Sequence, residues 1–365
     1  MRSNQKKDEI ILTIGIPTYN RGHILDLFFE KLFNATHFFS SKIEIIVSDN
    51  CSNDNTQNIC EDWMYKFEDF GNYLFNRNEK NLGGVLNLLF ILKKAKGKYF
   101  LFIGDDDQLN PDSIKKIIEI LDSSLSPSAI IQGVLDGNKK MNENGFISYH
   151  HAANYFYEYG NAYYGIINRK ASLEILNDNE IEKELITIVW PQTVIGFLAI
   201  HQLKHEYIYI TDFAIGGSLV ENQNLTNKLY WITSLYGLLK AAVIIDNKIQ
   251  FNWTKRKFVY PSNKGFLGHL KAIYWHSLID NSINSNEVIN VLNKNYGYMG
   301  RFFGFTLYLC DNYPNFFRFF YILILSVRTL RSPNSFLEEI KKSKIDFKNG
   351  QNSLKKSKKR FEDWF

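Results

Sequence analysis

A run of large apolar residues that stops at a glycine and three aspartates most constrains how this chain can fold. Residues 99–103 have the pattern of a buried strand, and Gly104 is followed at once by Asp105, Asp106 and Asp107. Three adjacent carboxylates repel one another. We therefore expect either a divalent cation, which prefers carboxylate oxygens, or a solvated acidic turn that begins the next helix.

Apolar strands alternate with helical patterns through the first 122 residues. Apolar runs at 10–17, 43–47 and 73–75 precede the run described above, and helical spacing fills the intervals. This alternation predicts an α/β fold, in which a mostly parallel sheet is flanked by helices and joined by right-handed crossovers. The carboxyl ends of parallel strands meet at one edge of a sheet, so we expect a ligand site there.

Two helices carry clear local signals. The first is expected near residues 24–33, with Ile24, Leu27, Phe28, Leu32 and Phe33 on its buried face. The second is expected over residues 111–121, because a proline stands in its first turn.

Four short motifs follow the predicted strands in order. They are Ile-Pro-Thr-Tyr-Asn-Arg at 16–21, Val-Ser-Asp-Asn at 47–50, Asn-Leu-Gly at 81–83 and Gly-Asp-Asp-Asp at 104–107. Together they resemble the family 2 glycosyltransferases, and within them the abequosyltransferase-like subgroup of bacterial surface-polysaccharide enzymes. The resemblance is strong over residues 10–125 and weakens towards residue 215. It implies a Rossmann-like GT-A fold, a nucleotide-sugar donor, Mg²⁺ or Mn²⁺, and inversion at the anomeric carbon.

The resemblance also assigns roles to the aspartates. In such enzymes a diphosphate leaves as an acceptor hydroxyl attacks, and a cation stabilises the departing charge. The usual family pattern is Asp-x-Asp-Asp, and here Gly104 stands in place of the first aspartate. The resemblance therefore implies Asp106 as the principal metal ligand, with Asp107 as the alternative ligand and Asp105 facing the ribose or the metal.

The other strand ends are assigned to the nucleotide by the same resemblance. Pro17, Thr18 and Tyr19 resemble the first nucleotide-contacting turn, and the alternative for Tyr19 is a core aromatic. Asp49 would accept a hydrogen bond from the base or ribose, or would instead cap the loop that follows it. Arg21 would meet a phosphate or form an ion pair with Asp49.

The loop before the third helix completes the predicted nucleotide site. Gly83 permits close approach of the backbone to a ligand. Asn87, one turn into the helix, would point back towards the site, or would be an ordinary exposed helix residue.

Residues 122–215 are expected to form the acceptor half. The family commonly has a Glu-Asp pair here that supplies the general base, and this chain lacks that pair. Glu184 is our candidate base because it borders the apolar run 185–190, and the alternative is a solvated helix charge. The missing pair leaves a second function open, a protein that binds nucleotide sugars without transferring them.

Near residue 220 the apolar residues change to a helical spacing, and we therefore predict three parts of the chain. These are a GT-A domain over 1–220, a mainly helical domain over 221–340, and a basic tail over 341–365. The aromatic segment 302–330 fits either a helical core or a helix that lies on anionic lipid. The tail combines many lysines with terminal aromatic residues, which favours attachment to an anionic membrane surface over a solvated tail.

Composition excludes several other classes. Only three cysteines are present, which argues against a disulfide framework and fits a reducing compartment. No uncharged apolar run approaches the roughly 20 residues that span a bilayer. The net charge of +5 is modest, and we expect no nucleic-acid partner. We expect a cytoplasmic protein, peripheral at the inner face of the plasma membrane, that acts on a glycan or a lipid-linked glycan.

Overall fold

The computed structural model describes residues 9–68, 71–135, 139–140, 144–149, 165–186, 188 and 191–219, together with scattered residues between 241 and 316. The chain divides into two compact units, and the first comprises mainly residues 1–187 and 191–223. Scattered residues of the second unit, such as Ala241 and Thr306, are helical and buried. Apart from these positions, the predicted helical domain over 221–340 lies outside the described residues. The tail over 341–365 lies outside them entirely.

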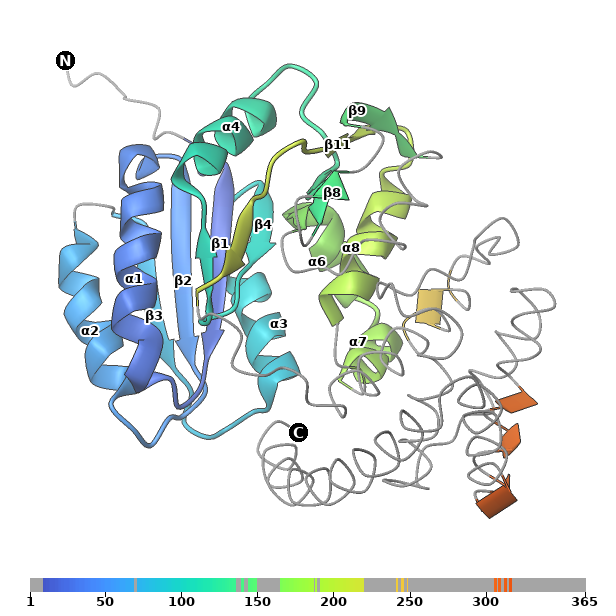
Figure 1. Cartoon of the computed structure of the whole chain (residues 1–365), viewed down its shortest axis with the longest axis horizontal. Coiled ribbons are helices and arrows are strands. Elements are labelled where there is room, and N and C mark those ends of the chain that lie inside the picture. Colours follow the sequence, from blue (N-terminus) through green and yellow to red (C-terminus); the bar gives the residue numbers. More distant parts are fainter. Residues whose placement is uncertain are drawn as a thin grey trace, which may run out of the picture. The chain divides into compact units, whose positions relative to one another are not determined.

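An eight-stranded sheet forms the centre of the first unit (Figure 1), in the order β3-β2-β1-β4-β10-β6-β11-β9. The strands are β1 (Leu12–Thr18), β2 (Ile43–Asp49), β3 (Tyr73–Arg77), β4 (Tyr99–Phe102), β6 (Ala129–Ile131), β9 (Gly145–Ser148), β10 (Ile166–Asn168) and β11 (Tyr207–Ile210). The pairs β3-β2, β2-β1, β1-β4 and β6-β11 are parallel. β10 inserts antiparallel between β4 and β6, and β9 pairs antiparallel with β11. The mostly parallel sheet is as predicted.

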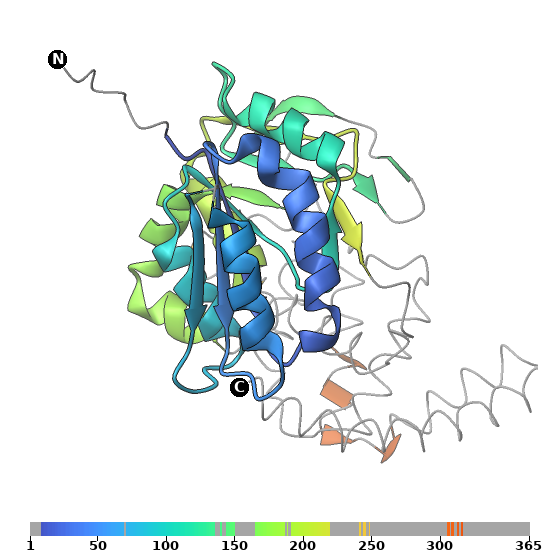
Figure 2. The same ribbon diagram turned by 90° about the vertical axis from the view of Figure 1, so that its left-hand side faces the viewer.

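Helices cover both faces of the sheet (Figures 1 and 2). One face carries α1 (Gly22–Thr36), α2 (Thr56–Lys66) and α4 (Pro111–Leu121), and the other carries α3 (Gly84–Lys94), α6 (Arg169–Leu176) and α8 (Pro191–Gln202). The remaining elements are η1 (His37–Phe39), α7 (Asn179–Leu185), and the short strands β5 (Asp107–Leu109), β7 (Val134–Leu135), β8 (Lys139–Lys140) and β12 (Gly216–Ser218). Within the described part of the chain, no helix has both the length and the apolarity that crossing a bilayer requires.

The central strands are buried from end to end because both faces are covered. Every residue of β2 and β4 is buried, including the charged Glu44. Its Oε2 accepts hydrogen bonds from the Thr13 hydroxyl and from the Lys96 backbone N–H, each at 2.7 Å. These two bonds offset the cost of burying a carboxylate in the sheet.

Helix α1 buries a face that overlaps only in part with the one we predicted. Leu25, Phe28, Phe29 and Leu32 are buried, whereas Leu27 is 47% exposed. The buried residues follow the i, i+3, i+4, i+7 spacing of one continuous stripe, and Leu27 stands outside it. The prediction for Leu27 was therefore wrong, although the helix itself was predicted.

The carboxyl ends of β1, β2, β3 and β4 lie at one edge of the sheet, as predicted. Thr18 at the end of β1 pairs with Asp49 at the end of β2, and Asp49 pairs with Arg77 at the end of β3. After β4 the chain turns into β5, which pairs antiparallel with β12. The Leu219 N–H, just after β12, donates a 2.8 Å bond to the Asp106 carbonyl. This bond fixes the backbone of residues 104–107, which we call the aspartate loop.

Candidate active site at the carboxyl edge of the sheet

The Asp105 carboxylate turns into the protein and joins the end of β4 to the end of β1. Its side chain is only 8% exposed, its Oδ2 accepts a 2.6 Å hydrogen bond from the Thr18 hydroxyl, and its Oδ1 lies 3.3 Å from Arg21 Nε. Burial raises the pKa of Asp105 to about 6, although Arg21 and Thr18 both act to lower it. In the structure Asp105 is buried and held by Thr18 and Arg21. Its predicted position facing the ribose or the metal stays a prediction.

The carboxylates of Asp106 and Asp107 approach a common point. The Asp106 side chain is 50% exposed, and its Oδ2 lies 3.6 Å from Arg21 Nη2. A Cβ atom added to Gly104 would lie 2.8 Å from Asp106 Oδ1 and 3.0 Å from Asp107 Oδ2. The glycine therefore leaves open a space that both carboxylates border, and any side chain at this position would push them aside.

This arrangement fits a cation that the substrate helps to hold. Mg²⁺ is usually bound by one or two carboxylates together with phosphate oxygens of the substrate. Among the residues that the structure describes, no group of three His, Cys, Asp or Glu side chains is arranged to hold a metal ion. Asp106 and Asp107 thus suit a shared cation, and the described residues do not form an all-protein cage.

Asp49 is buried at the end of β2 and anchors the loop that follows it. Its Oδ1 accepts hydrogen bonds from the backbone N–H of Ser52, at 3.0 Å, and from the Ser52 hydroxyl. Its Oδ2 lies 3.2 Å from Arg77 Nε. Arg77, rather than Arg21, is therefore the ion-pair partner of Asp49, and the predicted Arg21–Asp49 pair is replaced by the pairs of Arg21 with Asp105 and Asp106.

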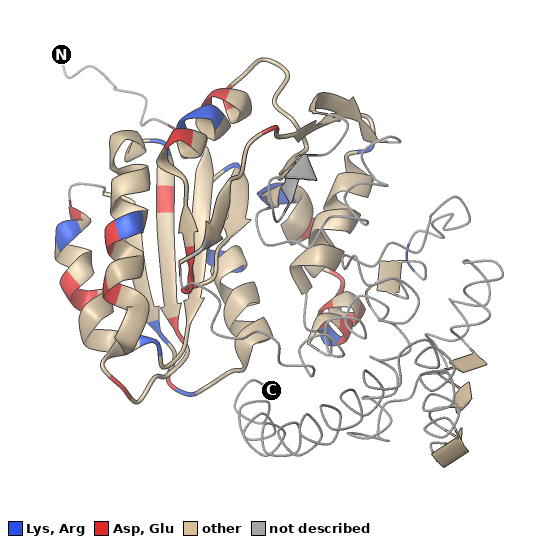
Figure 3. Cartoon of the chain, in the orientation of Figure 1, with Lys and Arg blue, Asp and Glu red and all other residues tan. Residues whose placement is uncertain are grey.

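The turn after β1 is held against the loop after β2. Pro17 lies within the last residues of β1, and Tyr19, which follows the strand, is partly buried. The Asn20 N–H donates a 2.8 Å bond to the Ser52 hydroxyl, and the Asn53 N–H donates a 3.0 Å bond to Asn20 Oδ1. These bonds join the loop after β1 to the loop after β2, and both loops were assigned to the nucleotide from the sequence. Figure 3 shows acidic and basic residues next to one another where the strands of the sheet end.

An asparagine network of Asn50, Asn78, Asn81 and Asn87 joins β2 and β3 to the start of α3. Asn78 Nδ2 donates to Asn50 Oδ1 at 3.0 Å and to Asn87 Oδ1 at 2.9 Å. Asn50 Nδ2 donates to Asn81 Oδ1 at 2.7 Å, and Asn87 Nδ2 donates to the Ser48 carbonyl at 2.9 Å. Asn87 is thus buried in this network, so it is not the exposed helix residue of the alternative prediction.

Gly83 fixes the entry into α3 through a backbone conformation that other residues rarely adopt. Its φ is +81°, its N–H donates a 2.8 Å bond to Asn81 Oδ1, and its carbonyl accepts from the Asn87 N–H at 3.2 Å. The sequence analysis assigned no role to Asn78. The dense spacing of asparagines between 76 and 87 was the signal that could have revealed it.

The predicted base, Glu184, is partly buried on α7. This helix packs against α6, and a 2.8 Å ion pair between Lys93 and Glu182 joins it to α3. Glu184 therefore comes from a helix, whereas the aspartates described above all stand at or after strand ends. Its role as base stays a prediction.

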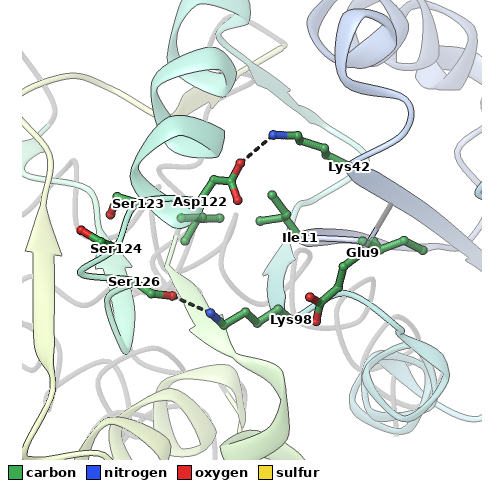
Figure 4. Close-up of a pocket in the computed structure, with 10 residues that line it drawn as sticks. Glu9, Ile11, Lys42, Lys98, Asp122, Ser123, Ser124 and Ser126 are labelled. Atoms are coloured by element: carbon green, nitrogen blue, oxygen red, sulfur yellow. Dashed lines mark hydrogen bonds and ion pairs between the residues drawn. The ribbon is translucent and has the colours of Figure 1, made fainter. Parts of the chain in front are cut away.

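A separate pocket lies at the opposite edge of the sheet, near the amino ends of β1 and β4 (Figure 4). Its walls are formed by Glu9, Ile10, Ile11, Lys42, Lys98, Leu121, Asp122, Ser123, Ser124 and Ser126. Lys42 pairs with Asp122 at 2.7 Å, and Lys98 donates a 2.6 Å bond to the Ser126 hydroxyl. Both lysines are thus paired within the protein, and we place the candidate active site at the carboxyl edge.

The family comparison bears directly on this edge. Residues 13–172 match the model of the family described as glycosyl transferase family 2. Residues 13–172 are therefore similar to the family 2 glycosyltransferases. This matched region, called the glycosyltransferase domain below, runs from β1 into α6, and so includes every strand end described above. Glu184 lies outside the matched region.

Curated relatives match the glycosyltransferase domain over only part of their length. Abequosyltransferase RfbV of Salmonella typhimurium is 34% identical over 116 residues, which cover 31% of this chain and 33% of that protein. A GalNAc(5)-diNAcBac-PP-undecaprenol beta-1,3-glucosyltransferase of Campylobacter jejuni is 30% identical over 108 residues, covering 30% of this chain and 33% of that protein. The similarity thus spans about a third of each of these relatives.

A solved structure supports the fold of the domain. The structure of S. aureus TarS 1-349 in complex with UDP-GlcNAc has a TM-score of 0.50 and 15% sequence identity, and the match covers 88% of this chain and 92% of that chain. At this identity the likeness concerns the fold alone. The predicted GT-A fold, with its mostly parallel sheet flanked by helices, is thereby confirmed for the glycosyltransferase domain.

Proposed function

We propose that this protein is an inverting glycosyltransferase. It would move a sugar from a nucleotide-sugar donor to a hydroxyl of a bacterial surface glycan or of its lipid-linked precursor. The observation that carries the proposal is the approach of Asp106 and Asp107 to one point, at the carboxyl edge of the glycosyltransferase domain. The names of these relatives support this class of acceptor, since they include an abequosyltransferase and an enzyme named for an undecaprenol-linked glycan.

Asp106 and Asp107 would hold Mg²⁺ or Mn²⁺ together with oxygens of the donor diphosphate. When bound, the cation would stabilise the charge that gathers on the leaving diphosphate. The chain's own contribution is to keep the two carboxylates close together. The hydrogen bond between Leu219 and Asp106 and the buried pair of Thr18 with Asp105 support this loop from both sides.

The nucleotide would lie across the loops that follow β1, β2 and β3. We assign Pro17, Thr18 and Tyr19 to the first of these loops, with Tyr19 against the base. Asp49 and Gly83 would form the opposite wall, and the bonds of Asp49 to Ser52 and Arg77 give that wall a fixed shape. The Thr18 hydroxyl already donates to Asp105, so Thr18 would contact the nucleotide through its backbone groups.

Glu184 would take the proton from the acceptor hydroxyl as the new glycosidic bond forms. A protein that binds the donor without transferring its sugar is the alternative, because the family's Glu-Asp pair is missing. Product formation separates the two. Retained donor binding without any transferred sugar would favour the alternative.

We also propose that the chain works at the inner face of the plasma membrane, with domains over 1–220 and 221–340. The support is the composition of the basic tail 341–365, which would attract anionic lipid. Deletion of the tail should release the protein from anionic vesicles in a sedimentation assay. Unchanged co-sedimentation would remove the tail from this proposal.

The test of the proposed activity starts from a screen of nucleotide sugars by thermal shift with Mn²⁺, followed by transfer to isolated surface glycans and their lipid-linked precursors. The donor that raises the melting temperature should also give a glycosylated product. Asp106→Asn should abolish transfer while the fold survives. Asp112→Asn is the matched control, because Asp112 is an exposed aspartate in the first turn of α4. Near-normal transfer by Asp106→Asn would refute the assignment.

A further inference from the structure

Arg21 links the buried carboxylate of the aspartate loop to the exposed one. Its Nε lies 3.3 Å from Asp105 Oδ1, and its Nη2 lies 3.6 Å from Asp106 Oδ2. The Arg21 side chain is 25% exposed, whereas the side chains of Asp105 and Asp106 are 8% and 50% exposed. One guanidinium is thus shared between a buried carboxylate and a half-exposed one.

The two oxygens of Asp106 have different surroundings. Oδ2 faces Arg21, while Oδ1 approaches the space above Gly104 that Asp107 also borders. Asp105 is tied to the Thr18 hydroxyl as well as to Arg21, so the Arg21–Asp105 pair can persist when Asp106 turns away. The geometry therefore allows Asp106 to exchange one cationic partner for another without disturbing the buried pair.

We propose that Arg21 competes with the divalent cation for Asp106 and makes cation binding depend on the diphosphate. The guanidinium neutralises part of the charge that would attract a cation, and it repels a second positive charge placed beside it. A diphosphate supplies negative charge to both groups, so the cation and the diphosphate bind cooperatively. Arg21 Nη2, released from Asp106, then donates to a phosphate oxygen. This inference rests on the proposed function.

The test is a titration of the full chain with Mn²⁺ alone, with free Mn²⁺ followed by electron paramagnetic resonance. Arg21→Gln should bind Mn²⁺ more tightly than the wild type, by roughly three- to tenfold, because the competing charge is gone. Lys115→Gln is the matched control. Lys115 is an exposed cationic residue on α4, outside the proposed nucleotide site, and its loss should leave Mn²⁺ affinity unchanged. Equal or weaker binding by Arg21→Gln would overturn the inference.

A second comparison tests the inference even if Arg21→Gln alone fails to fold. Arg21→Gln leaves Asp105 with one partner fewer, whereas Arg21→Gln combined with Asp105→Asn leaves no uncompensated buried charge. The double variant should bind Mn²⁺ more tightly than Asp105→Asn alone. No difference between these two proteins would contradict the inference.

Uridine diphosphate, guanosine diphosphate and cytidine diphosphate serve as the probes for cooperativity. In the wild type, the diphosphate that binds should raise Mn²⁺ affinity, and Arg21→Gln should show a smaller rise. Mn²⁺ binding that survives Asp106→Asn would refute the proposed metal site itself. If Asp106→Asn abolishes Mn²⁺ binding while Arg21→Gln has the Mn²⁺ affinity of the wild type, only the proposed competition by Arg21 is refuted.

Discussion

The hydroxyl of Thr18 donates a 2.6 Å hydrogen bond to the Asp105 carboxylate, and this bond joins the ends of two adjacent parallel strands, β1 and β4. The two residues are 87 positions apart in the sequence. Both are buried, so the bond lies where an unsatisfied carboxylate would be costly. It fixes Asp105 inward, and the aspartate that follows it is the one that faces solvent.

Replacement of Thr18 by valine keeps the shape of the side chain and removes the donor. We expect the free energy of unfolding to fall by about 1–3 kcal/mol, because a buried carboxylate loses one of its bonds. Thr18→Ser keeps the hydroxyl and should retain most of the stability. Urea unfolding of the three proteins measures the difference, and equal midpoints for wild type and Thr18→Val would contradict the role given to this bond.

The asparagine network should matter for both stability and donor binding. Asn78→Leu removes the donor that Asn50 and Asn87 share, and we expect a loss of about 1–3 kcal/mol of unfolding free energy. Donor affinity should fall as well, because the loop before α3 loses its support. Asn58→Ala changes an exposed asparagine on α2 and should stay within about 0.5 kcal/mol of the wild type. Similar effects of the two substitutions would count against the network.

Reactivity of two cysteines can locate the nucleotide site. Cys51 is partly exposed in the loop after Asp49, whereas Cys60 is buried on α2, and burial raises the pKa of its thiol. In a variant with Cys310→Ser, an alkylating agent should therefore modify Cys51 and spare Cys60 in the folded protein. A bound nucleoside diphosphate with Mn²⁺ should slow the labelling of Cys51, as followed by mass spectrometry. Labelling at an unchanged rate would argue against a nucleotide at this edge.

His201 on α8 should make stability depend on pH. The Tyr149 hydroxyl lies 2.7 Å from its Nδ1, and burial lowers its pKa from the ordinary value of 6.5. The unfolded chain then binds a proton more readily than the folded one, so stability falls as the pH drops through that ordinary value. His201→Gln should flatten this part of the stability profile in thermal unfolding scans. A profile of unchanged slope would contradict the assignment.

Local patterns explain why part of the fold could be predicted. Helix α4 has the predicted bounds because Pro111 starts it, and the Asn110 side chain accepts from the Asp112 N–H at 3.0 Å as a cap. Strand β10 was not predicted, because three residues carry too little periodicity. Its place comes from antiparallel pairing with β4 and β6, which are distant in the sequence.

Contacts between residues distant in the sequence also decide the arrangement of the candidate site. The sequence indicated that carboxylates gather after β4, but Asp105 and Asp106 are chemically alike and adjacent. Which of them turns inward depends on Thr18 and Arg21, which approach from the end of β1. Likewise, the choice of Arg77 as the partner of Asp49 follows from the register of β2 and β3.

The central claim is that Asp106 and Asp107 bind a cation that engages the diphosphate of a donor. Calorimetric titration of nucleoside diphosphates into the protein, with and without Mn²⁺, tests it most directly. We predict that binding requires Mn²⁺ and weakens by about tenfold or more in Asp106→Asn, while Asp112→Asn binds as the wild type does. Equal affinity in Asp106→Asn, or binding that ignores Mn²⁺, would contradict the account.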